Sequence, residues 1–146
     1  MPIPCFARLR SRPVSQVWVA SQSSVFGSVT PGTFANLNDM SGTTGTGTNS
    51  GSPEFIQATY TAPVTLSRVT VGGGNISGWG AVALYLNNAV FQYSTDNSNW
   101  ITLLTFTGVT DSGATQFKEF TFAATTARYW RISRSSFLST TEMRLS

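Results

Sequence analysis

The sequence predicts an all-β fold, a sandwich or barrel of about eight short antiparallel strands. Forty of the 146 residues are Ser or Thr, and only 10% are charged. Val, Thr, Phe, Tyr and Trp suit pleated surfaces and are plentiful, whereas the Ala, Glu, Lys and Leu of long helices are scarce. The length and the 40% apolar content suit one core. We expect a domain over 14–146, preceded by an arm over 1–13.

The expected strands follow one another at regular intervals, separated by turn residues. The first is VSQVWVA (14–20), in which Val17 and Val19 alternate with Trp18. The later ones are FIQATY (55–60), VTLSRVTV (64–71), VALYL (82–86), VFQYS (90–94), WITLLTF (100–106), FKEFTF (117–122), RYWRIS (128–133) and TEMRL (141–145). In FKEFTF, Phe120 and Phe122 share one face, so we expect one face of this strand to be core.

Two polar segments lie between expected strands. Residues 21–55 have almost no apolar rhythm, which predicts a long loop that is functional, organised by an ion, or flexible. TDNSN (95–99) lies between two apolar runs and predicts a hairpin turn, in which Asp96 and Asn97 suit the turn backbone. Trp100, at the start of the next strand, is expected to be a core or edge aromatic.

The charge distribution disfavours nucleic acid as a ligand of the folded part. The net charge is +3, and Arg8, Arg10 and Arg12 account for it, so the remaining basic and acidic residues cancel. The arm is expected either to dock on a protein partner, through Pro4, Phe6, Arg8 and Arg10, or to be disordered. Cys5 is the only cysteine, which excludes an internal disulfide. Neither a signal peptide nor a stretch that could insert into a membrane is recognisable.

The side-chain chemistry predicts that the chain is not an enzyme. The sequence contains no histidine, and its six carboxylates are scattered. The Gly-rich segment GGGNISGWG lacks the Lys and Ser or Thr of a phosphate-binding loop. Asp39 precedes MSGTTGTGT, whose oxygens could hold a hard cation such as calcium. The alternative is that Asp39 caps a turn through its own backbone.

Several segments occur in the order found in one known family. They are VASQSS, FANLNDM, SPEFIQATYTAPVTLSRVTV, QYSTDNSNWITL, ARYWRIS and TTEMRL. With them the chain resembles the discoidin, or coagulation factor 5/8 type C, family over residues 14–145. This family includes many carbohydrate-binding modules. The resemblance implies a galactose-binding-like jelly-roll sandwich of antiparallel strands.

The resemblance also implies functional residues. A structural calcium ion would be held by Asp39, by oxygens between Ser41 and Thr44, and by Glu142. Ligands would bind to loops at one end of the sandwich, where an aromatic ring stacks on a sugar and polar groups reach its hydroxyls. The residues of this kind are Phe26, Trp79 and Phe137, with Arg68, Asn75, Arg131 and Arg134. For each aromatic, the alternative is partial core packing or a protein interface.

Two functions fit these expectations. The first is a non-catalytic binding or adhesion module that recognises glycans or another cell-surface ligand, as part of a larger assembly. The second is a virion structural protein, such as a capsid decoration or a tail or fibre component, that docks through the jelly roll and the arm. Both predict a location outside the cell or on a virion surface, and both are compatible with a homo-oligomer.

Overall fold

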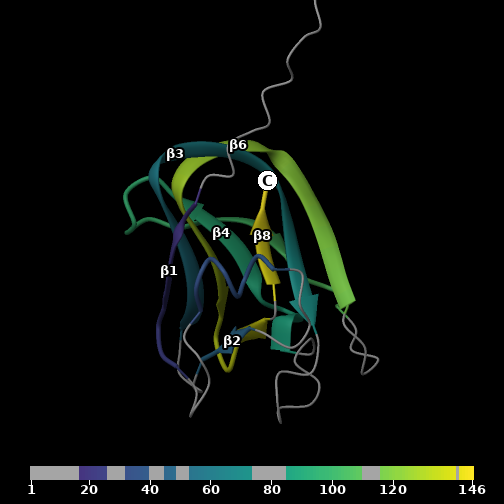
Figure 1. Cartoon of the computed structure of the whole chain (residues 1–146). Coiled ribbons are helices and arrows are strands. Elements are labelled where there is room, and N and C mark those ends of the chain that lie inside the picture. Colours follow the sequence, from purple (N-terminus) through teal and green to yellow (C-terminus); the bar gives the residue numbers. More distant parts are fainter. Residues whose placement is uncertain are drawn as a thin grey trace, which may run out of the picture.

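The computed structural model describes residues 17–25, 32–39, 45–48, 53–73, 85–109, 116–140 and 142–146. Within this part of the chain, eight strands pair in antiparallel fashion (Figure 1). They are β1 (Val19–Gln22), β2 (Thr46–Gly47), β3 (Glu54–Gly73), β4 (Val90–Ser94), β5 (Ile101–Thr105), β6 (Gln116–Arg134), β7 (Ser139–Thr140) and β8 (Glu142–Leu145). This confirms the predicted all-β antiparallel fold.

Strands β3 and β6 pair along nearly their whole length and arch together over one end of the molecule (Figure 1). Their register shifts between Thr59 and Val64 and again between Leu66 and Arg68. Such irregularities bend a strand and increase its twist. Pro63 lies in the first interruption, where its missing N–H costs the sheet no hydrogen bond. The strands predicted over 55–60 and 64–71 are therefore two halves of one bent strand, and β6 likewise joins 117–122 to 128–133.

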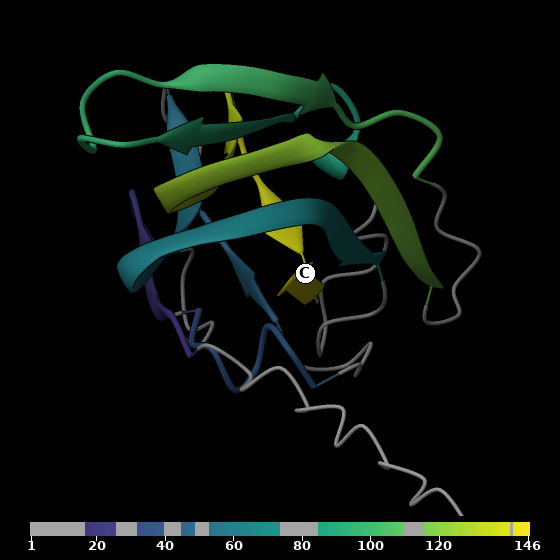
Figure 2. The same cartoon turned by 90° about the horizontal axis from the view of Figure 1, so that it is seen from above.

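The bend lets each long strand contribute to two layers. In one layer the order is β1, the first half of β3, the second half of β6, β4 and β5, which Figure 2 shows from above. In the other layer the second half of β3 pairs with both the first half of β6 and β8. Strands β2 and β7 form a separate pair. The layers enclose the core, and loops gather at the end away from the arch.

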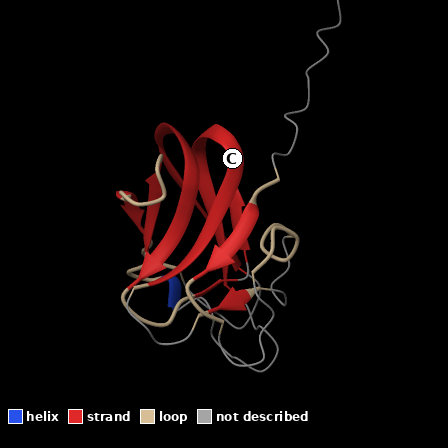
Figure 3. Ribbon diagram, turned by 90° about the vertical axis from the view of Figure 1, so that its left-hand side faces the viewer, coloured by secondary structure: helices blue, strands red, loops and turns tan. Residues whose placement is uncertain are grey.

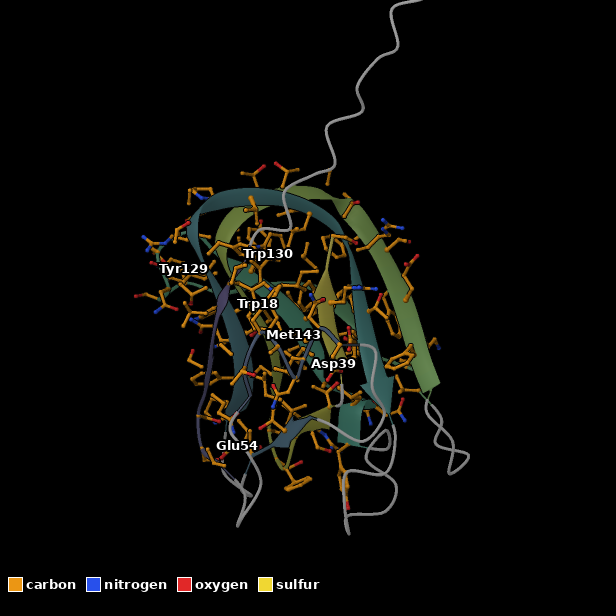
Figure 4. The ribbon with its side chains drawn as sticks, viewed as in Figure 1. Trp18, Asp39, Glu54, Tyr129, Trp130 and Met143 are labelled. Atoms are coloured by element: carbon orange, nitrogen blue, oxygen red, sulfur yellow. The ribbon has the colours of Figure 1, made fainter. Side chains whose placement is uncertain are left out.

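Aromatic rings dominate the core between the layers. Trp130 is fully buried, and its ring stacks on Phe91 with centroids 5.8 Å apart. Figure 4 shows Trp130, Trp18 and Met143 inside the sandwich. Phe120 and Phe122 pack against this core. The expectation that one face of FKEFTF is core is thus confirmed.

Three expectations about strands were wrong. Tyr85 and Leu86, placed in a strand over 82–86, form a short 3₁₀ turn, which is the helical segment in Figure 3; residues 82–84 lie outside the described residues. The first strand begins at Val19, so Val17 and Trp18 precede it. Strand β2 lies inside the segment expected to be entirely loop. The described residues contain no helix of the length and apolarity that crossing a bilayer requires.

The hairpin turn predicted at TDNSN is confirmed between β4 and β5. The Asp96 carboxylate accepts hydrogen bonds from the backbone N–H groups of Ser98 (2.9 Å) and Asn99 (2.8 Å) and from the Asn99 side chain (2.7 Å). Asn97 adopts φ 62°, which asparagine tolerates well. These bonds favour the ionised carboxylate and hold the pKa of Asp96 far below its ordinary value. The bonds from Asn99 contribute most.

Candidate functional site

The candidate site lies at the loop end of the sandwich, opposite the arch (Figure 1). Glu54 opens β3 and Arg134 ends β6, and the two are register partners across the sheet. Both occupy positions of the same parity as the core residues Ile56 and Ile132, so both side chains start on the core-facing side at the mouth of the sandwich. The sheet register thus places Glu54 and Arg134 opposite each other at the loop end, where their side chains bond to different segments.

Arg134 ties two loops together at this end. Its Nη1 donates hydrogen bonds to the carbonyl oxygens of Tyr85 (3.2 Å) and Phe137 (3.0 Å). The rings of these two residues meet edge to face, with centroids 4.6 Å apart and an interplanar angle of 73°. Tyr85 remains 40% exposed. The loop after Phe137 is fixed in turn, because the N–H of Thr48 donates a hydrogen bond of 2.8 Å to the Leu138 carbonyl. The result is a positioned aromatic pair at the surface.

Glu54 holds the segment that follows β1 at the same end of the sandwich (Figure 4). Its carboxylate accepts hydrogen bonds from the hydroxyls of Ser23 and Ser24, the latter at 2.7 Å. The residue is only 5% exposed, so most of its surface is shielded from water. The backbone N–H of Phe55 donates to Ser23 Oγ at 2.9 Å, which holds the segment after β1 against β3. Two hydroxyls and a carboxylate therefore sit at the mouth of the sandwich in a fixed arrangement.

Gln22 joins the loops that surround this end. Its Nε2 donates to the carbonyls of Ser24 (2.5 Å) and Gly47 (3.2 Å). Its Oε1 accepts from the backbone N–H of Gly32 (2.8 Å) and the hydroxyl of Thr46 (2.9 Å). A Cβ at Gly32 would meet Gln22 Oε1 at 3.2 Å and the Thr46 side chain at 3.0 Å, so a larger residue there would push these neighbours away by a few tenths of an ångström. One side chain thus connects β1, β2 and the turn that begins at Gly32.

The four described residues among those predicted to bind ligand do not form one site. Arg134 and Phe137 come together at the loop end. Arg68 lies in the second half of β3, where it is exposed and 3.6 Å from Glu119. Arg131 lies on the outer face of the layer that contains β1. The predicted ligand residues Phe26, Asn75 and Trp79, and the arm residues Pro4, Phe6, Arg8 and Arg10, lie outside the described residues.

Sequence reasoning missed Tyr85, Glu54 and Gln22 as parts of this end. Tyr85 was assigned to a strand because VALYL is an apolar run. The pair Asn87 and Asn88 that follows is a turn signal, and Asn88 indeed has φ 66°. For Glu54 and Gln22 the sequence offers no comparable signal, since their partners are distant in the chain.

Two of the predicted metal ligands belong to neighbouring segments, because the turn that contains Asp39 bonds to β8, which begins at Glu142 and includes Met143 (Figure 4). The N–H of Met143 donates to the Leu37 carbonyl at 2.8 Å, which brings the turn beside Glu142. The Glu142 side chain is fully buried. The described residues include no group of three or more His, Cys, Asp or Glu that could bind a metal. Two carboxylates among hydroxyls and carbonyls fit calcium, which takes oxygen ligands, better than zinc. Ser41 and Thr44 lie outside the described residues.

Comparison with known proteins agrees with this architecture. The family model of the F5/8 type C domain matches residues 19–142. Chitosan-binding module 1 of a chitosanase/glucanase from Paenibacillus sp. IK-5 superposes with a TM-score of 0.65 at 23% identity, over 90% of this chain and 96% of that one. The CpGH89CBM32-5 module of Clostridium perfringens, solved with GalNAc-β-1,3-galactose, gives a TM-score of 0.64 at 16% identity, over 88% and 94%.

A pectin-binding carbohydrate-binding module gives a TM-score of 0.62 at 18% identity, over 90% of this chain and 91% of that one. No curated protein sequence matches the chain significantly. At these identities the solved structures establish the jelly-roll fold, while the family model covers most of the sequence. The chain therefore belongs to the F5/8 type C domain family.

Proposed function

We propose that the chain is a non-catalytic module that binds glycans at the loop end of its sandwich. The observation that carries this proposal is the aromatic pair of Tyr85, which is 40% exposed, and Phe137, both held at the loop end by Arg134. A sugar presents apolar C–H faces and polar hydroxyls together, so its site needs rings and hydrogen-bonding groups side by side. The modules with the same fold that bind GalNAc-β-1,3-galactose and pectin support the same ligand class.

Replacing either aromatic ring should weaken glycan binding without unfolding the protein. We expect Phe137→Ala and Tyr85→Ala each to raise the dissociation constant about tenfold, since stacking energies are of order 1 kcal/mol. A glycan array with the parent protein selects the sugar, and calorimetric titration measures its affinity. Trp79→Ala belongs in the same series, because Trp79 is predicted to be a ligand residue.

The matched control is Ile101→Ala, which removes an exposed apolar side chain at the edge strand β5. Its affinity should equal that of the parent. Unchanged binding by both Phe137→Ala and Tyr85→Ala, with the fold intact by circular dichroism, would contradict the loop-end site.

We also propose that Asp39 and Glu142, with oxygens of Ser41 and Thr44, hold one structural calcium ion. The hydrogen bond from Met143 to the Leu37 carbonyl supports this, because it brings the turn that contains Asp39 beside Glu142, and carboxylate oxygens are ligands that calcium takes. Calcium should raise the melting temperature and a chelator should lower it. The shift should be several degrees if calcium binding stabilises the folded state by about 1–3 kcal/mol. Glu142→Gln should abolish the response to calcium. If neither calcium nor a chelator changes the melting temperature of the parent protein, the calcium proposal is wrong.

The setting of the module is also a proposal. We infer that it works outside the cell as part of a larger assembly, in line with the expected docking role of the arm. The virion role, the arm's protein partner and a homo-oligomer stay predictions from the sequence.

A further inference from the structure

The outer face of the layer that contains β1 carries a second group of polar and aromatic side chains. Successive residues of a strand point to opposite faces, so Tyr129 and Arg131 face outward while Trp130 enters the core. Figure 4 shows Tyr129 at the outside of the sandwich and Trp130 within it. Gln57, Arg131, Gln92 and Thr102 are register partners and form one row across four strands.

Hydrogen bonds and rings position Arg131 within this row. Its Nε donates to Gln92 Oε1 at 2.8 Å, and Gln92 Nε2 donates to Thr102 Oγ1 at 3.0 Å. The guanidinium carbon lies 3.9 Å from the centroid of the Trp100 ring and 5.7 Å from that of Phe55. These rings come from either side of β6 in the sheet order. The guanidinium thus lies close to one aromatic ring and within cation–π distance of a second, and arginine makes such contacts more often than lysine does.

The hairpin between β4 and β5 completes the face. Gln57 Nε2 donates to Asn97 Oδ1 at 3.0 Å, so the turn bonds back to β3. Trp100, which follows this turn, then lies over Arg131. In the adjacent row, Tyr129 is the partner of Thr59 and Ser94 and is within cation–π distance of Arg128. The face therefore offers a partly exposed phenol ring in the row adjacent to that of Arg131.

The two Nη groups of Arg131 have hydrogen bonds left to give. Among the described residues, none accepts a hydrogen bond from either Nη, and no carboxylate lies within ion-pair distance of Arg131. Partial burial lowers the pKa of Arg131, yet a guanidinium stays charged at neutral pH. Asp96 in the nearby hairpin is already engaged by Ser98 and Asn99. A planar positive group with two parallel donors fits a carboxylate.

We propose that this outer face binds the carboxylate of an acidic sugar, through Arg131, as a second contact separate from the loop end. The proposal rests on the glycan-binding function and names a substrate class for it, polysaccharides that contain uronic acid. Arg131 Nη1 and Nη2 donate to the two carboxylate oxygens, while the sugar ring lies against Tyr129. Neighbouring units of the chain extend along the row of Gln92 and Thr102, whose amide and hydroxyl suit sugar hydroxyls.

Titration with oligogalacturonate, and with a neutral oligosaccharide from the array, tests this site. Arg131→Gln should weaken oligogalacturonate binding about tenfold, the loss expected for one charge-assisted contact of about 1.5 kcal/mol. Thr102→Glu keeps Arg131 and its rings but adds a negative charge to the row, and should weaken the same binding similarly. Neutral-sugar binding should not change in either variant, and rising salt should weaken only the acidic ligand.

Ser67→Glu is the control, because it makes the same charge change at an exposed position of the other layer. It should bind oligogalacturonate as the parent does. Oligogalacturonate affinity that is unchanged in both Arg131→Gln and Thr102→Glu overturns the proposal and leaves Arg131 as a structural partner of Trp100. If poly-glutamate binds the parent as tightly as oligogalacturonate does, and Thr102→Glu abolishes this binding too, the proposal is overturned in favour of an acidic protein ligand.

The failure of this proposal can be told apart from the failure of the glycan-binding function. If a neutral sugar binds in a Phe137-dependent way and oligogalacturonate does not bind, only the outer-face site is lost. If no glycan binds at all, the function proposed for the loop end is lost with it.

Discussion

Trp130→Ala is expected to lower the free energy of unfolding by about 3–5 kcal/mol, a large part of the stability of a domain of this size. The ring is fully buried and contacts Phe91, Tyr93 and Phe122, with centroid distances of 5.8, 5.9 and 6.1 Å. Its Nε1 also donates to the Ala127 carbonyl at 3.2 Å. The substitution leaves a cavity and removes a buried hydrogen-bond donor from its acceptor. Urea unfolding followed by circular dichroism measures the loss.

Trp100→Ala is the matched control, since it makes the same exchange on the outer face. Trp100 lies over Arg131 and is only partly buried, so we expect a loss of no more than about 2 kcal/mol. Equal losses for the two tryptophans would show that the core is not centred on Trp130.

Gln22→Met should cost about 2–3 kcal/mol and loosen the loop end, although methionine matches glutamine in length. Four hydrogen bonds to Ser24, Gly47, Gly32 and Thr46 disappear together, and their partners are left in partly buried positions. Because these partners belong to three separate segments, glycan affinity at the loop end should fall along with stability. Urea unfolding measures the loss of stability, and hydrogen exchange of the Gly32 amide measures the loosening of the loop end.

The control is Gln92→Met, which removes two hydrogen bonds on the outer face, where water can replace them. Its unfolding free energy should stay within about 1 kcal/mol of the parent. A Gln22→Met protein as stable as the Gln92→Met protein would mean that water substitutes for the amide at the loop end as well.

Local patterns predicted the fold where the strands are short and bounded by turn residues. VFQYS and WITLLTF alternate clearly around TDNSN, and they form the β4 and β5 hairpin. The same rules split β3 and β6 in two, because Pro63 is typical of turns and residues 123–127 contain no large apolar side chain. In the structure the chain bends at these places without leaving the sheet, and a bend of this kind depends on the partner strand rather than on local sequence.

The candidate sites were predictable only in part. An aromatic residue in a predicted loop was enough to single out Phe137, and Arg134 was singled out as a polar group that could reach sugar hydroxyls. Alternation in RYWRIS already separates Arg131 from Trp130, yet it cannot say that Trp100 covers the guanidinium, because the two are distant in the chain. The roles of Gln22 and Glu54 likewise depend on which loops meet, and sheet register decides that.

The long pairing of β3 with β6 has a consequence for how this chain folds. Gly73 pairs with Gln116, so residues 74–115, including the whole β4 and β5 hairpin, are looped out before the central pairing forms. Closing a long loop costs entropy before any contact repays it, and folds rich in such distant contacts form slowly, in milliseconds to seconds. The β4 and β5 hairpin can form first on its own, whereas both layers require the loop between β3 and β6 to close. We therefore expect the two halves of the sandwich to form together, in one cooperative step.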